Sequence, residues 1–183
     1  SGSSAPTTVE QRAQALRPGF EVSRMLHEMP KPTLAAIPGA AAGAGCSLAL
    51  ACDLRIAVDS AKITTAFSKV GLSGDYGMSY FLPLLVGHTK ARELMFTAQV
   101  ITGEQALALG LINKSVTVEE FPNVVNTMAA QLAALPTVAL GYMKKNLNAS
   151  NTQSLSQILD SEAMSMARCF TTEDHKGAAQ AFV

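Results

Sequence analysis

The chain has 183 residues, of which 48% are hydrophobic and 15% are charged, enough apolar content to bury a sizeable core. Basic and acidic residues number 14 each, and the formal net charge of zero argues against nucleic-acid binding, which favours a basic stripe. So low a charge content is also typical of proteins that bury part of their surface in an oligomer.

Cysteine usage and hydropathy indicate the compartment. The three cysteines show neither metal-ligand spacing nor an even disulfide framework, and we interpret them as small buried residues in a reducing environment: Cys46, Cys52 and Cys169. No apolar run reaches the ~20 residues that span a bilayer. The first eight residues lack the basic start of a signal peptide. We therefore expect a cytoplasmic protein without a membrane partner.

The first half of the chain alternates helical and strand patterns. Residues 1–8 predict a flexible loop, and residues 9–29 predict a helix that Pro18 and Gly19 interrupt. A short apolar strand follows at residues 33–37. The next glycine- and alanine-rich turn opens a helix over residues 44–51.

Two further strands, at residues 54–58 and 63–66, complete a crossover unit of the kind that packs helices on a sheet. Helical spacing then recurs in residues 78–86 and 90–97. Thr102 and Gln105 form a capping box that starts another helix. A strand at 111–116 precedes an almost wholly helical tail with breaks near Pro136, Asn151 and Thr171. The sequence predicts an α/β core over residues 1–117 and a helical region over 118–183.

The glycine turn at residues 37–46 is one candidate site. Glycines allow a ligand to approach backbone N–H groups closely, and a helix N-terminus adds unpaired donors and a partial positive charge. Such a turn suits a phosphate or a developing oxyanion. It also suits simple close packing of a helix on a strand, and both interpretations stay open on these residues alone.

Carboxylates are sparse in the core half. Between Met29 and Arg92 only Asp53, Asp59 and Asp75 occur. Asp53 and Asp59 have the positions of structural hydrogen-bonding and turn residues. Asp75 lies between glycines where a helix begins, so it is an ordinary N-cap of that helix, a catalytic group, or both.

The histidines give no support to metal or Ser–His chemistry. His27, His88 and His175 lie far apart in the sequence and make no cluster at ligand or triad spacing with other residues. We expect no metal site.

Three stretches together resemble the crotonase (enoyl-CoA hydratase/isomerase) superfamily. They are KPTLAAIPGAAAGAGCSLALACDLRIA, AKITTAFSKVGLSGDYGMSYFLPLLVG and ARELMFTAQVITGEQALALGLINKSV. The resemblance implies a crotonase (ClpP-like) ββα spiral core followed by a helical trimerisation region, and a homotrimer or dimer of trimers. It implies an acyl-CoA thioester as substrate, with coenzyme A as part of that substrate.

The resemblance also implies roles for individual residues. The thioester oxygen would accept a hydrogen bond from the Ala44 backbone N–H as an enolate forms. Asp75 matches the catalytic aspartate of isomerase-type members, such as the phenylacetyl-CoA epoxide isomerases. The remaining positions that would line the substrate site are Gly43, Gly45, Ser47, Phe67, Leu72 and Gly74.

Two departures from the hydratase pattern bear on the reaction. The two glutamates that split water in hydratases fall at Ser47 and Phe67, neither of which carries a carboxylate. Aroyl-CoA dehalogenases share the aspartate but need a tryptophan eight residues before it, where this chain has Phe67 and contains no tryptophan. The pattern thus favours proton transfer by a single base.

Family members also carry an upstream N-terminal third, with the strand and loop that give the first oxyanion N–H, so the resemblance implies an incomplete spiral core here. Three functions follow for the sequence. The favoured one is an acyl-CoA isomerase that uses Asp75. The others are a hydratase and a degenerate domain that binds acyl-CoA or acts only as an oligomeric scaffold.

Overall fold

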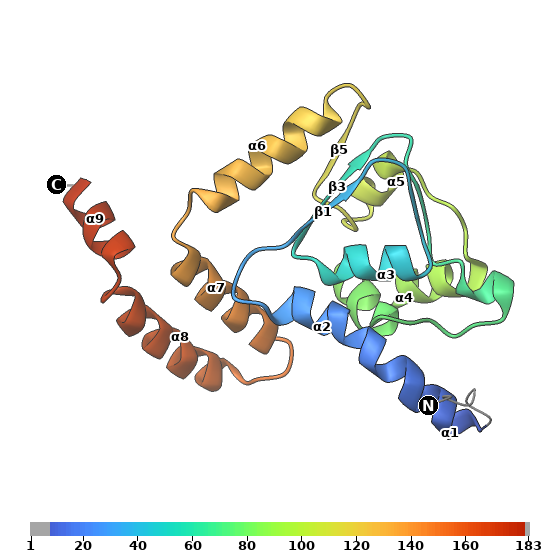
Figure 1. Cartoon of the computed structure of the whole chain (residues 1–183), viewed down its shortest axis with the longest axis horizontal. Helices are drawn as coiled ribbons and strands as arrows, with labels where there is room; N and C mark the ends of the chain where they lie inside the picture. The colour runs from blue at the N-terminus through green and yellow to red at the C-terminus, as the bar shows by residue number, and fades with distance from the viewer. Residues whose placement is uncertain (1–7, 182–183) are drawn as a thin grey trace, which may run out of the picture. The chain divides into compact units, whose positions relative to one another are not determined.

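The computed structural model describes residues 8–181 (Figure 1), so the predicted flexible loop at 1–8 lies, except for Thr8, outside the described residues. The described chain forms two compact units. One contains the residues up to His27 together with Leu34–Pro122, and the other contains Glu28–Thr33 together with the residues from Asn123 onward. The predicted α/β class with a helical C-terminal part agrees with this content.

The first predicted helix is three consecutive pieces. They are α1 (Val9–Leu16), the 3-10 helix η1 (Arg17–Phe20) and α2 (Glu21–Glu28). Thr8 caps α1 through a capping box, and Pro18 stands at the start of η1, where its missing N–H costs least. The interruption expected at Pro18-Gly19 is therefore confirmed.

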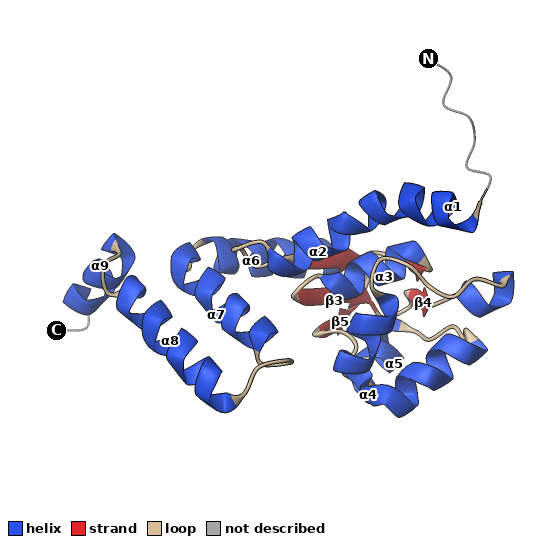
Figure 2. Cartoon of the chain, turned by 90° about the horizontal axis from the view of Figure 1, so that it is seen from below, coloured by secondary structure: helices blue, strands red, loops and turns tan. Residues whose placement is uncertain are grey.

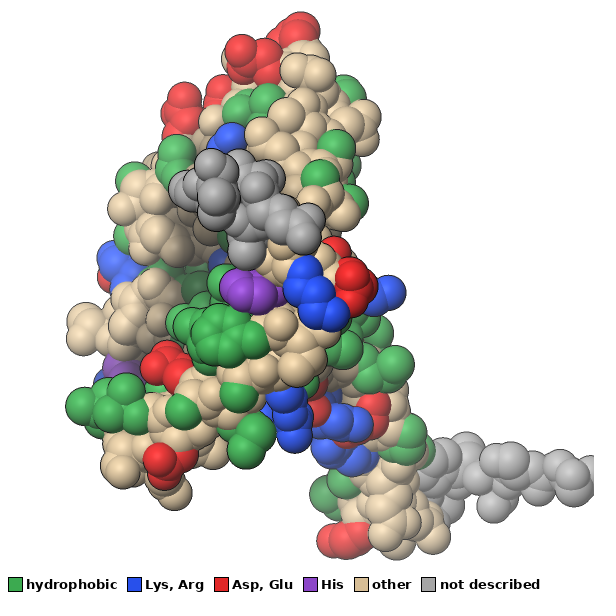
Figure 3. Space-filling view, turned by 90° about the vertical axis from the view of Figure 1, so that its left-hand side faces the viewer, with side chains coloured by type: hydrophobic (Ala, Val, Ile, Leu, Met, Phe, Trp, Pro, Cys, Tyr) green, Lys and Arg blue, Asp and Glu red, His purple; other side chains and the backbone are tan. Residues whose placement is uncertain are grey.

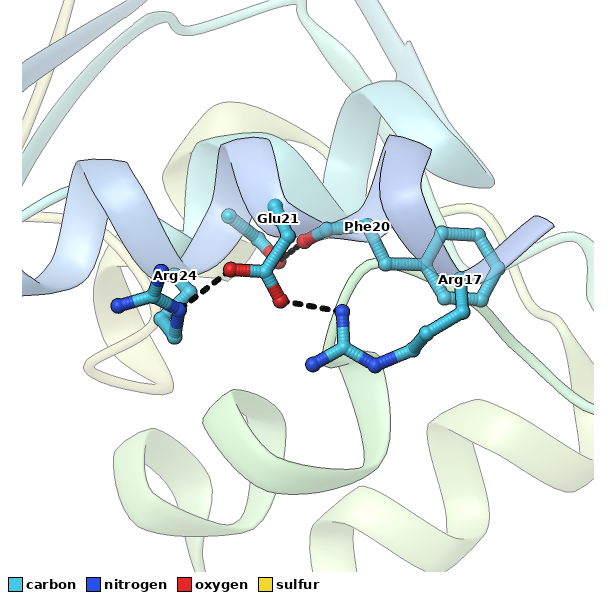
Figure 4. Close-up of polar contacts among 5 residues, drawn as sticks. Arg17, Phe20, Glu21 and Arg24 are labelled. Carbon is cyan, nitrogen blue, oxygen red and sulfur yellow. Dashed lines mark hydrogen bonds and ion pairs between the residues drawn. The ribbon is translucent and has the colours of Figure 1, made fainter. Parts of the chain in front are cut away.

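Ion pairs join η1 to α2. The Glu21 carboxylate accepts hydrogen bonds from Arg17 and, at 2.5 Å, from Arg24 Nε (Figure 4). These hydrogen bonds lower the pKa of Glu21, first through Arg24 and then through Arg17. All three side chains are about one-third exposed or more, so solvent weakens the pairs, and they contribute little to stability.

Five strands of the first unit form two parallel sheets (Figure 2). Their bounds are β1 (Leu34–Ile37), β2 (Ala40–Ala42), β3 (Leu54–Val58), β4 (Lys62–Thr64) and β5 (Lys114–Val116). One sheet has the order β1-β3-β5 and the other pairs β2 with β4. The chain therefore runs from one sheet to the other, crosses back through helix α3 (Ala44–Ala51) and repeats the pattern.

Strand β2 was not among the predicted elements. Its three alanines have low intrinsic strand propensity and look like part of the glycine turn in the sequence. In the structure Ala40, Ala41 and Ala42 pair in parallel with Lys62, Ile63 and Thr64. Pairing across the sheet thus decides the conformation of this segment, not local preference.

The helices that follow agree closely with the expected breaks. Helix α4 (Met78–Thr97) contains Gly87 at φ 73°, which separates the two helical stretches predicted on either side. Helix α5 (Gly103–Ala108) begins with the predicted capping box of Thr102 and Gln105. The chain leaves α5 through Gly110, whose φ of 72° suits glycine.

The core of this unit lies around β3, α3 and the first turns of α4. Ile56, Ala57, Met78 and Leu82 are almost wholly buried there. Burying such side chains provides the main stabilisation, at roughly 25 cal/mol per Å² of apolar surface. This core holds the N-termini of α3 and α4 in place, and the candidate site lies between these two N-termini.

The second unit is helical. Its elements are α6 (Phe121–Ala133), α7 (Thr137–Ala149), α8 (Leu155–Cys169) and α9 (Glu173–Ala181), with breaks where Pro136, Asn151 and Thr171 predicted them. Among the described residues no single helix is long and apolar enough to cross a membrane. Helices α6 and α7 pass that test only when joined, and they are bent by 100° at their break.

Helix α7 packs against the short segment of residues 28–33. Buried Lys144 donates from Nζ to the Lys31 carbonyl at 3.1 Å. A Cβ on Gly141 would lie 2.9 Å from the Pro30 carbonyl oxygen, so glycine allows this close approach.

Figure 3 shows hydrophobic side chains between charged ones on the face it views.

Candidate active site

The N-terminus of α3 is formed by Gly43. This residue has φ 51° and ψ −122°, a conformation that residues with a side chain rarely adopt. Its N–H donates to the Thr64 carbonyl at 3.2 Å. The Gly43 carbonyl accepts the Ser47 N–H at 2.9 Å inside the helix. Because a trans peptide directs its C=O and N–H oppositely, the Ala44 N–H points away from the helix.

The loop that carries Asp75 is shaped by a run of left-handed backbone conformations. Four of its residues have positive φ: Gly71 (68°), Gly74 (112°), Tyr76 (44°) and Gly77 (84°). For Tyr76 this conformation is uncommon, and such positions concentrate at functional sites. The loop therefore aims Asp75 in a direction that a regular turn would not provide.

Asp75 does not cap helix α4, so the ordinary-cap interpretation is wrong. The N-cap is Gly77, which has no side chain, and Asp75 contributes only its backbone carbonyl, which accepts the Met78 N–H at 2.9 Å. Tyr76 and Gly77, both left-handed, stand between Asp75 and the first helical residue, Met78. Its side chain is left for another contact.

That contact is with α3. Ser47 Oγ lies 3.2 Å from Asp75 Oδ1 and 3.2 Å from the Gly43 carbonyl oxygen. Ser47 is fully buried and Asp75 is half-buried. Two predicted site residues 28 positions apart thus meet beside the helix N-terminus. A carboxylate next to outward-pointing N–H donors can move a proton while those donors stabilise the resulting anion.

The aromatic side chain next to Asp75 attaches the loop to η1. The rings of Tyr76 and Phe20 lie 4.9 Å apart between centroids, and Ser23 Oγ donates to the Phe20 carbonyl at 2.8 Å. A tilted ring pair at this distance adds to the stability of the contact. Neither aromatic residue was among the predicted site residues. The one feature of the sequence that could have indicated this contact was the position of Tyr76 in a glycine-rich loop.

Three further predicted site residues differ in how buried they are and in what they contact. Phe67 is buried, and a Cβ on Gly43 would lie 3.8 Å from its ring, so the ring lies beside the helix start. Gly74 packs near Met95. Leu72 is 64% exposed, and its role in substrate binding stays a prediction.

A separate cavity of about 270 Å³ lies against β1 and α3. Its apolar lining includes Leu26, Pro38 and Leu48. Of the predicted site residues, all of which the structure describes, only Gly45 lines it. The Ser47–Asp75 pair is therefore not part of this cavity.

Cys46, next to Ser47, is poorly suited to act as a nucleophile. The thiol is buried, and burial raises its pKa to about 12. At neutral pH it carries essentially no thiolate, which is the reactive form. This agrees with its interpretation as a small buried residue and leaves Asp75 as the group suited to proton transfer.

Known proteins similar to this chain are named for reactions of coenzyme A esters. The enoyl-CoA hydratase/isomerase family model matches residues 5–183. A short-chain-enoyl-CoA hydratase of Clostridium acetobutylicum is 35% identical over 165 residues, which are 90% of this chain and 63% of that protein. A 1,2-epoxyphenylacetyl-CoA isomerase of Escherichia coli is 36% identical over 160 residues, which are 87% of this chain and 61% of that protein.

Solved structures show the same likeness. An enoyl-CoA hydratase from Polaromonas has a TM-score of 0.89 and 34% identity, over 96% of this chain and 68% of that one. The chain spans less than two thirds of the length of the two curated relatives above.

Proposed function

Because the chain belongs to the enoyl-CoA hydratase/isomerase family, within the crotonase superfamily, we propose that it acts on an acyl-CoA thioester by isomerase-type proton transfer. The same membership confirms the predicted α/β crotonase fold with a helical C-terminal region. In this proposal Asp75 is the base, and the Ala44 N–H is one donor to the thioester oxygen. No cofactor is needed, since coenzyme A is part of the substrate.

The proposed reaction moves a double bond toward the thioester. The Asp75 carboxylate takes a proton from C2 of a 3-enoyl-CoA, and the electron pair of that C–H bond delocalises into the thioester, whose oxygen becomes negative. The Ala44 N–H donates to this oxygen. Asp75 then returns the proton to C4, which yields the 2-enoyl-CoA and restores the carboxylate. One base suffices for both transfers.

The single observation that carries the proposal is the contact of Asp75 with α3. The carboxylate lies 3.2 Å from Ser47 Oγ, one helical turn from the outward-pointing Ala44 N–H. A base and an anion-stabilising donor are thus held together by two elements of the same compact unit. Preorganised donors of this type typically contribute about 100- to 1,000-fold to a rate.

Hydration is the second candidate function, because curated relatives at 35% and 34% identity are named hydratases. The residues at the two hydratase glutamate positions weaken it. Ser47 presents a fully buried hydroxyl, and Phe67 presents a buried ring. Neither can act as a carboxylate base toward water.

The reaction is tested by giving the protein two substrates in parallel. We expect double-bond migration of trans-3-hexenoyl-CoA to exceed hydration of crotonyl-CoA by at least about tenfold in kcat/KM, the effect of about 1.4 kcal/mol in transition-state stabilisation. Both reactions are followed by ultraviolet absorbance of the 2-enoyl thioester. Faster hydration than migration would instead support the hydratase.

A degenerate domain that only binds acyl-CoA, or serves as a scaffold, is the remaining alternative. Titration calorimetry with hexanoyl-CoA identifies a pure scaffold, which binds none. A domain that only binds acyl-CoA is identified by binding without migration of trans-3-hexenoyl-CoA. An assembly of three or six copies is proposed on the apolar side chains that the helical unit exposes. Among them are Leu147 at 70% and Leu155 at 74% exposure.

A further inference from the structure

The Ser47 hydroxyl has one hydrogen and two acceptors within reach. Its oxygen lies 3.2 Å from both Asp75 Oδ1 and the Gly43 carbonyl oxygen. A serine inside a helix often bonds to the carbonyl four residues earlier, so the Gly43 contact alone is ordinary. The Asp75 contact is what makes the position unusual, because one hydroxyl can donate to only one of the two at a time.

The protonation state of Asp75 decides which acceptor receives the hydrogen. An ionised carboxylate only accepts, and a hydrogen bond to a charged group is the stronger one, so Ser47 then donates to Asp75. After Asp75 takes the substrate hydrogen on its other oxygen it is neutral, and its Oδ1 is a weaker acceptor for the Ser47 hydroxyl. The Ser47 hydrogen is then free to turn to the Gly43 carbonyl.

The Gly43 carbonyl belongs to the same peptide group as the Ala44 N–H. A second hydrogen bond to that carbonyl, added to the one from the Ser47 N–H at 2.9 Å, polarises the peptide further. Polarisation strengthens the donor at the other end, by ~10–30% per bond. The Ala44 N–H therefore donates more strongly when Ser47 bonds to Gly43.

We infer that Ser47 is a positioning residue that couples proton uptake by Asp75 to the donor strength of the Ala44 N–H. The inference rests on the proposed function and adds a reason for serine at this position. As Asp75 takes the substrate proton, the thioester oxygen becomes negative, and the Ser47 hydrogen moves from Asp75 to Gly43. The donor that faces the oxygen gains strength at the moment when the charge develops.

Burial makes such coupling effective. Ser47 has no exposed surface, so water cannot replace either of its partners. In a buried setting hydrogen bonds are stronger than in water, and neighbouring bonds polarise one another. The neighbouring Cys46 thiol stays protonated and does not compete as a charged acceptor.

The kinetic test compares Ser47→Ala with wild type in the migration of trans-3-hexenoyl-CoA. We expect kcat to fall about two- to eightfold, the effect of losing ~10–30% of a donor contribution of about 100- to 1,000-fold, while KM changes by less than about twofold. Ser47→Cys keeps the side-chain shape with a weaker donor and should lie between them. Wild-type kcat in both variants, with Asp75→Asn inactive, would overturn the coupling and leave the proposed function standing.

The matched control is Ser115→Ala. Ser115 Oγ donates to Asp59 Oδ1 at 2.6 Å, so this change also removes a serine–aspartate hydrogen bond between distant segments of the same unit. It should change kcat by less than about twofold. An equal loss in Ser115→Ala and Ser47→Ala overturns the coupling, because the effect would then be a general loss of rigidity.

A spectroscopic test separates coupling from a structural role. The side-chain amide introduced by Asp75→Asn is neutral, as a protonated carboxyl is, and its NH2 group can donate to Ser47 Oγ, so Ser47 should then donate permanently to Gly43. We expect the thioester carbonyl stretch of bound hexanoyl-CoA, measured by infrared spectroscopy with a carbon-13 label, to be lower in Asp75→Asn than in the double variant Asp75→Asn with Ser47→Ala. Equal frequencies overturn the coupling. Absence of hexanoyl-CoA binding to wild type overturns both the coupling and the proposed function.

Discussion

Asp75→Asn is expected to lower kcat for migration of trans-3-hexenoyl-CoA by about 100- to 10,000-fold, the usual contribution of a positioned general base. The amide has the size of the carboxylate and keeps a partner for Ser47 Oγ, but it cannot accept a proton from carbon at neutral pH. Binding should survive, because the substitution leaves the N-terminus of α3 and its N–H donors in place. Steady-state kinetics and titration with hexanoyl-CoA measure the two effects separately.

Asp59→Asn is the control for this change. Asp59 follows β3 and accepts a hydrogen bond from Ser115 of β5, so the substitution also alters an aspartate that joins distant segments of the same unit. It should leave kcat within about twofold of wild type. Undiminished turnover by Asp75→Asn would remove Asp75 from the mechanism.

Arg55→Met is expected to lower the free energy of unfolding by about 3 kcal/mol, since several buried carbonyls would lose a charged donor. Arg55 is 4% exposed. Its Nε donates to the Leu111 carbonyl at 2.8 Å, and its guanidinium reaches the carbonyls of Cys52 at 2.5 Å and Leu50 at 3.5 Å at the end of α3. Burial lowers the pKa of Arg55 and so disfavours its charged form, which makes the loss of partners for that charge costly.

Arg24→Met is the matched control for that prediction. Arg24 also bonds an acceptor at 2.5 Å, the Glu21 carboxylate, but its side chain is 56% exposed. Solvent weakens exposed pairs, so this one should contribute little. Urea unfolding of both variants measures the difference. A loss for Arg55→Met no larger than that for Arg24→Met would contradict the larger contribution assigned to the buried arginine.

Local signals predicted most helix limits. Residues within a few positions of each other determine the capping box at Thr102, the breaks at Pro18 and Pro136, and the helix at Ala44–Ala51. Strand β2 escaped prediction because its three alanines gain their conformation from pairing with β4, which the local sequence does not encode.

The candidate site was predictable only in part. The resemblance pointed to Asp75 and Ser47 separately, but local sequence says nothing of their contact, because they are 28 residues apart. The cap interpretation of Asp75 failed for a related reason. The left-handed Tyr76 moves the cap to Gly77, and a non-glycine residue in that conformation is rarely predicted from sequence. The Phe20–Tyr76 contact likewise joins distant segments.

The most direct test of Asp75 as the single base follows deuterium placed at C2 of trans-3-hexenoyl-CoA through one turnover in ordinary water. One base that removes and returns the same hydrogen transfers part of the label to C4 of the product. We predict deuterium at C4 with the wild-type protein and no such product in the same time with Asp75→Asn. Product that carries only solvent hydrogen at C4 and forms equally fast with both proteins would contradict the assignment.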